Sequence, residues 1–370
     1  MTPLESVLKR HDTVRHGHVI VAALAVTLAG CSPSTGADSQ PMDGEGIRLH
    51  PVFTVQGEDH PALPGPVLQA AVNDCSEFSF VFYPTHWAIQ RFDSLGNHLG
   101  AFGNEGEGPG EFQSVGPILH RPGDSTWVFD GSLARWTVFD GNWKPTRTFP
   151  GVGDMRDVVE LPGNRFVLAN PYATGQLPMY PLHVMDAEGQ IDRSFGTDEP
   201  ESDPRRDWRV RRAIASATGG GFWAAHHYNY VLDRYDDRTE LVNTLRRITD
   251  WFPEIQAPSS SLSERPNPFI LAVRDDGLGH LWVLVAVPEP DWEEAIPSGA
   301  AGATEGRVDT DALLGTRLEV LDTESGDLIA HLYTNDLLNI FLENGAIVGY
   351  AENGRGVPIV TVWRGYLVNQ

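Results

Sequence analysis

The feature that most constrains the fold is a turn motif that recurs along the chain. In each copy, a strand-like run ends in an aromatic or aliphatic residue followed by Asp and a short polar turn. Asp side chains cap such turns and glycine accepts their positive φ, which is the chemistry of a hairpin between antiparallel strands. The copies lie 47, 46, 50 and 86 residues apart, at Asp93, Asp140, Asp186, Asp236 and Asp322. Four strands and about 45 residues per repeat is the period of a β-propeller blade.

The spacing predicts an all-β, six-bladed propeller. The last unit is one strand short, and residues 47–55 have a strand-like composition ahead of the first unit. Pairing these two segments would close the ring and remove exposed edges. A seventh blade would need a divergent unit within 252–330, and Leu241 to Trp251 fits either a strand or a single helical insert. The units are 72–103, 115–150, 155–196, 211–251, 269–333, enlarged by an insertion, and 338–368.

The N-terminal segment predicts export. Basic residues precede an uncharged run, Val19 to Ala29, which suits the apolar region of a signal peptide and is shorter than the roughly 20 residues that span a bilayer. Leu28-Ala29-Gly30-Cys31 resembles the lipobox of bacterial lipoproteins. That resemblance implies cleavage before Cys31, acylation of Cys31, and anchoring to a membrane of the bacterial cell envelope on its extracytoplasmic side.

This resemblance divides the chain into three parts. Residues 1–30 form the signal peptide, and residues 31–46, rich in Ser, Pro, Gly and acidic side chains, form a lipidated flexible tether. Residues 47–370 form the propeller domain. The formal net charge is −23, which repels nucleic acid and favours neutral, cationic or protein partners. With Cys31 acylated, Cys75 has no internal disulfide partner, and we expect it to be a small buried residue.

A family resemblance is carried by one stretch. Gly103 to Phe112, followed by Trp127 to Asp130 and Arg135 to Asp140, resembles the NHL-type six-bladed propeller lipoproteins of bacteria. The resemblance implies a glycine-rich turn between two blades, in which we expect Phe112 to pack between them. Asp130 and Arg135 fit either a set of turn-holding contacts or a role toward a ligand in the central funnel. Blades three to six lack this Asp–Arg pair.

Polar candidates for a ligand site follow the apolar strands of successive units. If the run Phe222 to Tyr230 is a strand, His226 and Tyr228 share one face and His227 takes the other. Adjacent histidines cannot then bind one metal, and His86, His183 and His280 show no metal-ligand spacing. We assign no catalytic residue and no metal ligand. The ligand-binding candidates, expected around the funnel on one face, are His86, Arg135, Asn170, Tyr172, His226 and Tyr228.

These features favour a binding function, with a small molecule or a protein partner held at one face. Two alternatives stay open: a metal-dependent hydrolase or lyase of the gluconolactonase or amidating-lyase kind, and a scaffold within an envelope complex. The sequence names no cofactor. The insertion 288–315 is too long for an ordinary hairpin, and its length suits a lid or a partner-binding element.

Overall fold

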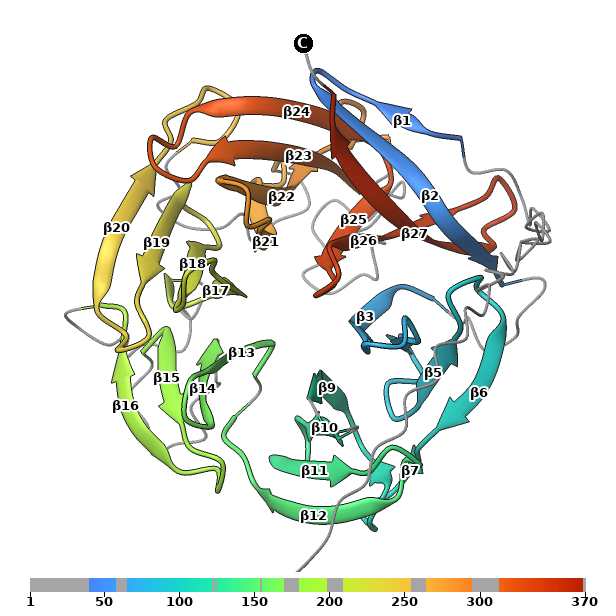
Figure 1. Ribbon diagram of the computed structural model, residues 1–370. Helices are drawn as coiled ribbons and strands as arrows, with labels where there is room; N and C mark the ends of the chain where they lie inside the picture. The colour runs from blue at the N-terminus through green and yellow to red at the C-terminus, as the bar shows by residue number, and fades with distance from the viewer. Residues whose placement is uncertain are drawn as a thin grey trace, which may run out of the picture. The chain divides into compact units, whose positions relative to one another are not determined.

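The computed structural model describes residues 40–57, 65–121, 123, 125–153, 155–169, 180–197, 209–253, 264–294 and 313–368. These residues form one compact unit, in which six antiparallel sheets surround a central axis as the blades of a propeller (Figure 1). No helix in these ranges is long and apolar enough to cross a membrane. The predicted signal peptide, Cys31 and most of the tether lie outside the described residues.

Each of the first five blades is a four-stranded meander whose first strand lies nearest the axis. Blade one contains β3 (Val67–Val72), β4 (Phe78–Phe82), β5 (Ile89–Phe92) and β6 (His98–Phe102). Blade two contains β9 (Val115–Arg121), β10 (Ser125–Asp130), β11 (Arg135–Phe139) and β12 (Pro145–Pro150). Blade three contains β13 (Asp157–Leu161), β14 (Arg165–Ala169), β15 (Leu182–Met185) and β16 (Ile191–Phe195).

The second half of the ring repeats this plan. Blade four contains β17 (Arg212–Ser216), β18 (Phe222–His226), β19 (Val231–Tyr235) and β20 (Leu241–Arg246). Blade five contains β21 (Phe269–Asp275), β22 (His280–Pro288), β23 (Leu314–Asp322) and β24 (Leu328–Thr334). The first part of Leu241 to Trp251 is a strand, β20. The strands described within 252–330 all belong to blade five, so the described residues form no seventh blade.

The sixth blade closes the ring as predicted. Its own strands are β25 (Leu337–Phe341), β26 (Ala346–Glu352) and β27 (Pro358–Leu367), and the N-terminal strand β2 (Ile47–Gln56) pairs antiparallel with β27. Strand β1 (Met42–Asp43) extends the sheet outward. A small parallel pair, β7 (Asn104–Glu105) and β8 (Glu111–Phe112), lies in the connection between blades one and two.

The recurring Asp residues cap the turns between the third and fourth strands of blades one to five, as predicted. In blade three, for example, Asp186 Oδ1 accepts the backbone N–H groups of Glu188 (2.9 Å) and Gln190 (2.8 Å). The residue near the end of each turn has positive φ, which explains the glycine at this position in three of them. These residues are Gly96, Trp143, Gly189, Thr239 and Gly326.

Neighbouring blades interlock at these turns, a feature that the sequence analysis did not identify. An apolar residue on the outer strand of one blade packs against the positive-φ residue of the next blade's turn. The ring centroids of Phe102 and Trp143 are 4.7 Å apart, and Phe149 lies against Gly189. Phe112 is fully buried in a cluster shared by blades one and two, which confirms its predicted place.

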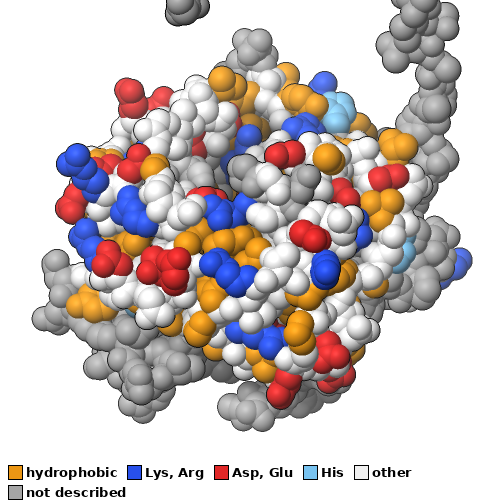
Figure 2. Space-filling view, turned by 60° about the horizontal axis from the view of Figure 1, so that its bottom comes forward, with side chains coloured by type: hydrophobic (Ala, Val, Ile, Leu, Met, Phe, Trp, Pro, Cys, Tyr) orange, Lys and Arg blue, Asp and Glu red, His pale blue; other side chains and the backbone are white. Residues whose placement is uncertain are grey.

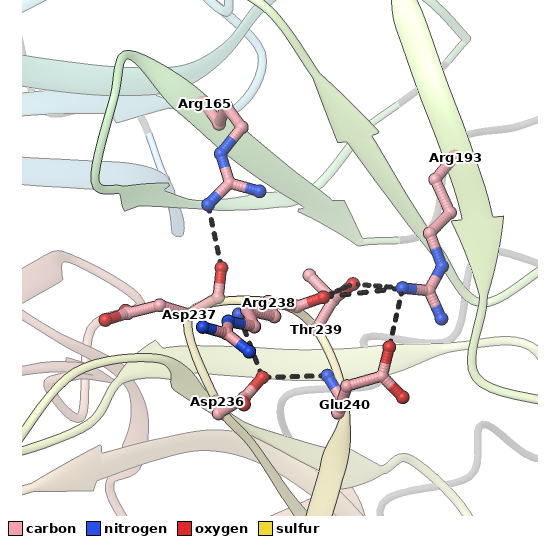
Figure 3. Close-up of polar contacts among 7 residues, drawn as sticks. All are labelled: Arg165, Arg193, Asp236, Asp237, Arg238, Thr239 and Glu240. Atoms are coloured by element: carbon pink, nitrogen blue, oxygen red, sulfur yellow. Dashed lines mark hydrogen bonds and ion pairs between the residues drawn. The ribbon is translucent and has the colours of Figure 1, made fainter.

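Arginines reinforce this interlock between blades three and four (Figure 3). Arg193 of β16 donates from Nη1 to Thr239 Oγ1 (2.9 Å) and Glu240 Oε1 (3.2 Å), both in the turn after β19. Arg165 of β14 donates from Nη2 to the carbonyl oxygen of Asp237 (2.8 Å). The turn is therefore held by its own Asp and by two side chains of the preceding blade.

The two faces of the propeller carry connections of different length. Because the strands alternate in direction, the first and third connections of every blade lie on one face, which we call the turn face. These connections contain three to five residues, for example 162–164 and 236–240. The second connection of each blade and the links between blades lie on the opposite face, the loop face. Its connections include 103–114, 170–181, 196–211, 247–268 and 289–313.

Candidate functional site

Two histidines occupy equivalent positions on the loop face. The carbonyl oxygen of His86, in the connection after β4, accepts the N–H of Val115 at the start of the next blade's inner strand (2.7 Å). In blade four, the carbonyl oxygen of His227 accepts the N–H of Ile270 in the same way (2.8 Å). The counterpart of His86 in blade four is therefore His227, which we did not include among the candidates.

His226 belongs to a polar row that crosses blade four. Its Nε2 lies 2.8 Å from Asp233 Oδ2, and Asp233 Oδ1 accepts the hydroxyl of Thr244 (2.7 Å). Burial and the nearby Arg212 guanidinium lower the pKa of His226, against the opposing effect of Asp233. Although burial raises the pKa of Asp233, its hydrogen bonds with His226 and Thr244 bring the net shift below the usual value. A charged carboxylate thus orients an imidazole at the loop-face end of β18.

The chain turns directly after His226, so the strand alternation that we expected for residues 226–230 does not apply. The His227 ring lies 4.7 Å, centroid to centroid, from both Tyr228 and Phe269. The Tyr228 and Phe269 centroids are 5.8 Å apart. Residues that an extended strand would place on opposite faces therefore contact the same phenylalanine.

Arg135 holds the glycine-rich connection between blades one and two. Its guanidinium donates to the carbonyl oxygens of Glu107 (2.6 Å), Gly108 (2.9 Å) and Glu111 (3.0 Å). Asp130 accepts backbone N–H groups of the same region, from Gln113 (2.8 Å), Ser114 (3.3 Å) and Leu133 (3.0 Å). The observed contacts are those of a turn-holding set.

The structure brings only some of the ligand-site candidates together. His226 ends β18 and Tyr228 lies in the connection that follows it, whereas His86 lies in blade one beside Trp87 and Arg135 begins β11 of blade two. All four lie in connections of the loop face or at the strand ends beside them. Asn170 and Tyr172 lie outside the described residues. A ligand-binding role for these six residues remains a prediction.

The other histidines have local structural partners. His183 is buried, with Nδ1 2.7 Å from Ser194 Oγ, and burial lowers its pKa to about 4. His280 Nδ1 lies 2.9 Å from Asp276 Oδ2 in the same turn. Within the ranges that the structure describes, no three His, Cys, Asp or Glu side chains gather as a group that could hold a metal ion.

Cys75 is exposed, contrary to the expectation of a small buried residue. It lies in the turn between β3 and β4, where its N–H donates to Asn73 Oδ1 (3.0 Å). The turn geometry, rather than the apolar character of the thiol, sets its exposure.

The fold is shared with solved structures of low sequence identity. A candidate exported protein from Bacteroides fragilis superposes with a TM-score of 0.58 at 10% identity, over 88% of this chain and 96% of that one. A member of the DUF4221 family from Bacteroides vulgatus gives 0.57 at 10% identity, over 88% and 100%. Virginiamycin B lyase from Staphylococcus aureus gives 0.46 at 11% identity, over 85% and 99%.

No protein-family model matches the sequence, and no curated protein matches it significantly. The structural similarity therefore establishes the propeller fold and leaves the chemistry to be argued from the residues.

Proposed function

We propose that this chain is an exported, lipid-anchored propeller of the bacterial cell envelope that binds a small molecule or a protein at its loop face. Export is supported by the apolar run before Cys31, by the lipobox-like Leu28-Ala29-Gly30-Cys31 and by the similarity of Gly103 to Phe112 to NHL-type lipoproteins. A structural relative is itself a candidate exported protein.

We assign the binding site to the loop face because its connections are longer than those of the turn face. The turns of the opposite face contain only three to five residues, and several are capped by their own Asp or Asn side chain, as at Asp93, Asp140 and Asn344. A chain that needs only to close a ring gains nothing from a link as long as 247–268, since blades can be joined by two residues, as at 335–336, or from a connection within a blade as long as 289–313. Long connections on a rigid scaffold are the usual carriers of binding function.

Polar side chains strengthen this assignment. The His226–Asp233 pair, His227 and Tyr228 are all half-buried or buried and lie at the loop-face end of blade four. Binding sites typically combine such oriented polar groups with aromatic walls.

Site-specific photo-crosslinking in the intact envelope tests the choice of face. A photoreactive amino acid at Ile248, on the loop face, is compared with one at Leu278, on the turn face; their side chains are 100% and 79% exposed. For a protein partner, we expect adducts from position 248 and none from position 278. Adducts from 278 alone would contradict the proposal.

Native mass spectrometry of the protein purified from its own envelope tests whether a small ligand is bound. We expect a bound mass that is lost when loop-face residues such as Tyr228 are replaced and kept when turn-face residues such as Leu278 are replaced. If neither experiment detects a partner, the binding function is wrong.

A further inference from the structure

A fully buried carboxylate, that of Glu319 on β23, lies at the boundary between blades four and five. Its Oε1 accepts Nε of Arg317 on the same strand (2.8 Å), and its Oε2 accepts the hydroxyl of Tyr230 (2.6 Å). Arg247 brings Nη2 to 3.4 Å from Oε2. Tyr230 and Arg247 lie in connections of the loop face, so the group lies toward that face. We call these four residues the Glu319 cluster.

The cluster contains two guanidinium charges and one carboxylate. Burial and the Glu319 charge raise the pKa of Tyr230 well above its usual value, so the hydroxyl keeps its proton and adds no negative charge. Among the described residues, neither Arg247 nor Arg317 forms an ion pair with a second carboxylate. The cluster therefore has a surplus positive charge, although the whole chain is strongly acidic.

The cluster also has more N–H donors than acceptors. Both Glu319 oxygens already accept a short hydrogen bond. The Nη atoms of Arg317 donate to no residue in the described ranges. The Nε of Arg247 is buried and has no hydrogen-bond partner in the same part of the chain. Since buried donors in proteins are nearly always paired, this excess points to an acceptor that the protein itself does not supply.

Arg121, at the turn-face end of β9, is a matched case in which the donors are paired. Its guanidinium stacks over Trp127 at 4.7 Å from the ring centroid, the same distance as that of Arg317 over Trp251. However, Arg121 forms a bidentate pair with Glu160, from Nε (3.0 Å) and Nη2 (2.5 Å). Basic and acidic side chains are likewise interspersed on the face in Figure 2. Arg317 has the stacking of Arg121 without the bidentate carboxylate.

The orientation of Arg317 determines which ligand it can accept. Trp251 covers one face of the guanidinium and Glu319 takes Nε, so the edge formed by the two Nη atoms is left for a ligand. The Arg317 side chain is 21% exposed, which gives solvent access to the group. Two parallel N–H donors match the two oxygens of a carboxylate. A single negative charge would also neutralise the surplus charge of the cluster.

We propose that the Glu319 cluster binds a small molecule through a carboxylate group, which accepts hydrogen bonds from the Arg317 Nη atoms and is attracted by the Arg247 charge. Glu319 and Tyr230 are positioning residues that hold the two arginines side by side. This inference rests on the proposed function and specifies the ligand class of the loop face. It departs from the neutral or cationic partners that the net charge alone predicts, because the local charge differs from the overall one.

An NMR titration of the full purified protein, followed at the arginine Nε–H resonances, tests the proposal with two probes. Acetate carries the carboxylate, and acetamide has nearly the same shape without the charge. We expect acetate to shift the Arg317 resonance to saturation in the millimolar range, and acetamide to bind at least about tenfold more weakly. The Arg121 resonance should show no saturable shift. A linear response to acetate, equal binding of acetamide, or equal saturation at Arg121 would overturn the proposal.

Three variants locate the site, with acetate binding followed at the Arg247 resonance. Arg317→Gln should weaken binding about tenfold, because it removes the charged fork. Arg317→Lys keeps the charge without the fork and should weaken binding severalfold, which also decides the question if Arg317→Gln does not fold. Arg121→Gln should leave binding unchanged. Unchanged binding in the Arg317 variants, or an equal loss in Arg121→Gln, would overturn the site.

The crosslinking and native-mass results do not depend on this titration. A loop face that binds a ligand of another class would still be recognised by them when acetate fails to bind the Glu319 cluster.

Discussion

Ile47 of β2 lies opposite Leu367 of β27, so segments from far apart in the chain share one sheet. The pairing continues to Gln56 and Ile359, and Ile47, Leu49 and Val55 are almost completely buried. Closure of the ring therefore depends on the N-terminal strand.

Deleting Ile47 to Val55 should destabilise the whole propeller. The deletion exposes the edge of β27 and removes several buried side chains worth roughly 1.5–3 kcal/mol each, a sum comparable to the stability of a typical domain. Phe53→Ala, at a side chain that is 7% exposed, should cost about 3 kcal/mol in the free energy of unfolding. Val52→Ala, on the same strand but exposed, is the control. Thermal and denaturant unfolding measure both, and an unchanged melting temperature for the deletion would refute closure.

The interlock between blades predicts unequal effects at two glycines. Gly189 (φ 85°) and Gly163 (φ 81°) share a left-handed backbone, so alanine at either position should cost about 1 kcal/mol in the free energy of unfolding. A Cβ at Gly189 would also overlap the carbonyl oxygen of Pro150, whereas one at Gly163 meets nothing within 4 Å. Gly189→Ala should therefore be the more destabilising by about 2 kcal/mol. Similar losses in urea unfolding would show that the outer strand of blade two does not constrain this turn.

Asp157 predicts a pH dependence of stability. Burial raises its pKa to about 7, against the lowering effect of hydrogen bonds from Ile214 and Val158. Between about pH 4 and 7 the folded state then binds more protons than the unfolded state, so this group's stabilising contribution declines as pH rises through that window. Asp157→Asn should flatten the decline.

Glu343 contributes to the same window, because burial and the Asp74 and Glu160 carboxylates raise its pKa to about 7. The slope that remains in Asp157→Asn should therefore fall further in the double variant with Glu343→Gln. Urea unfolding at several pH values measures this, and a slope unchanged by Asp157→Asn would show that this carboxyl ionises normally in the folded state.

The exposure of Cys75 predicts rapid labelling of the native protein. A maleimide should react with the folded chain at a rate close to that of the urea-unfolded chain, and Cys75→Ser should abolish the reaction if Cys31 is acylated. Labelling only after unfolding would mean that the turn between β3 and β4 is covered.

The blade count and the Asp turns could be predicted because they leave a short, local signal that recurs along the chain. The ring closure could be predicted because the last unit is one strand short and residues 47–55 have the composition of a strand. The interlock could not, because Phe102 and Trp143 belong to different blades and meet only when the outer strand of one blade covers the turn of the next. The contact between an outer strand and the next blade's turn can be recognised as a repeat only when the relative position of neighbouring blades is known.

The site was only partly predictable for a different reason. Strand alternation depends on where the strand ends, and β18 ends at His226 rather than continuing through Tyr230. Because the chain turns after His226, His227 and Tyr228 both contact Phe269.

The account depends above all on whether the protein leaves the cytoplasm with Cys31 at its N-terminus. Intact-mass and N-terminal peptide analysis of the protein isolated from membranes tests this directly. We predict a first residue of Cys31 that carries acyl chains, and a Cys31→Ala protein that lacks the lipid mass and leaves the membrane fraction. A membrane-bound Cys31→Ala protein, or a wild-type protein that retains residues before Cys31, would contradict the account.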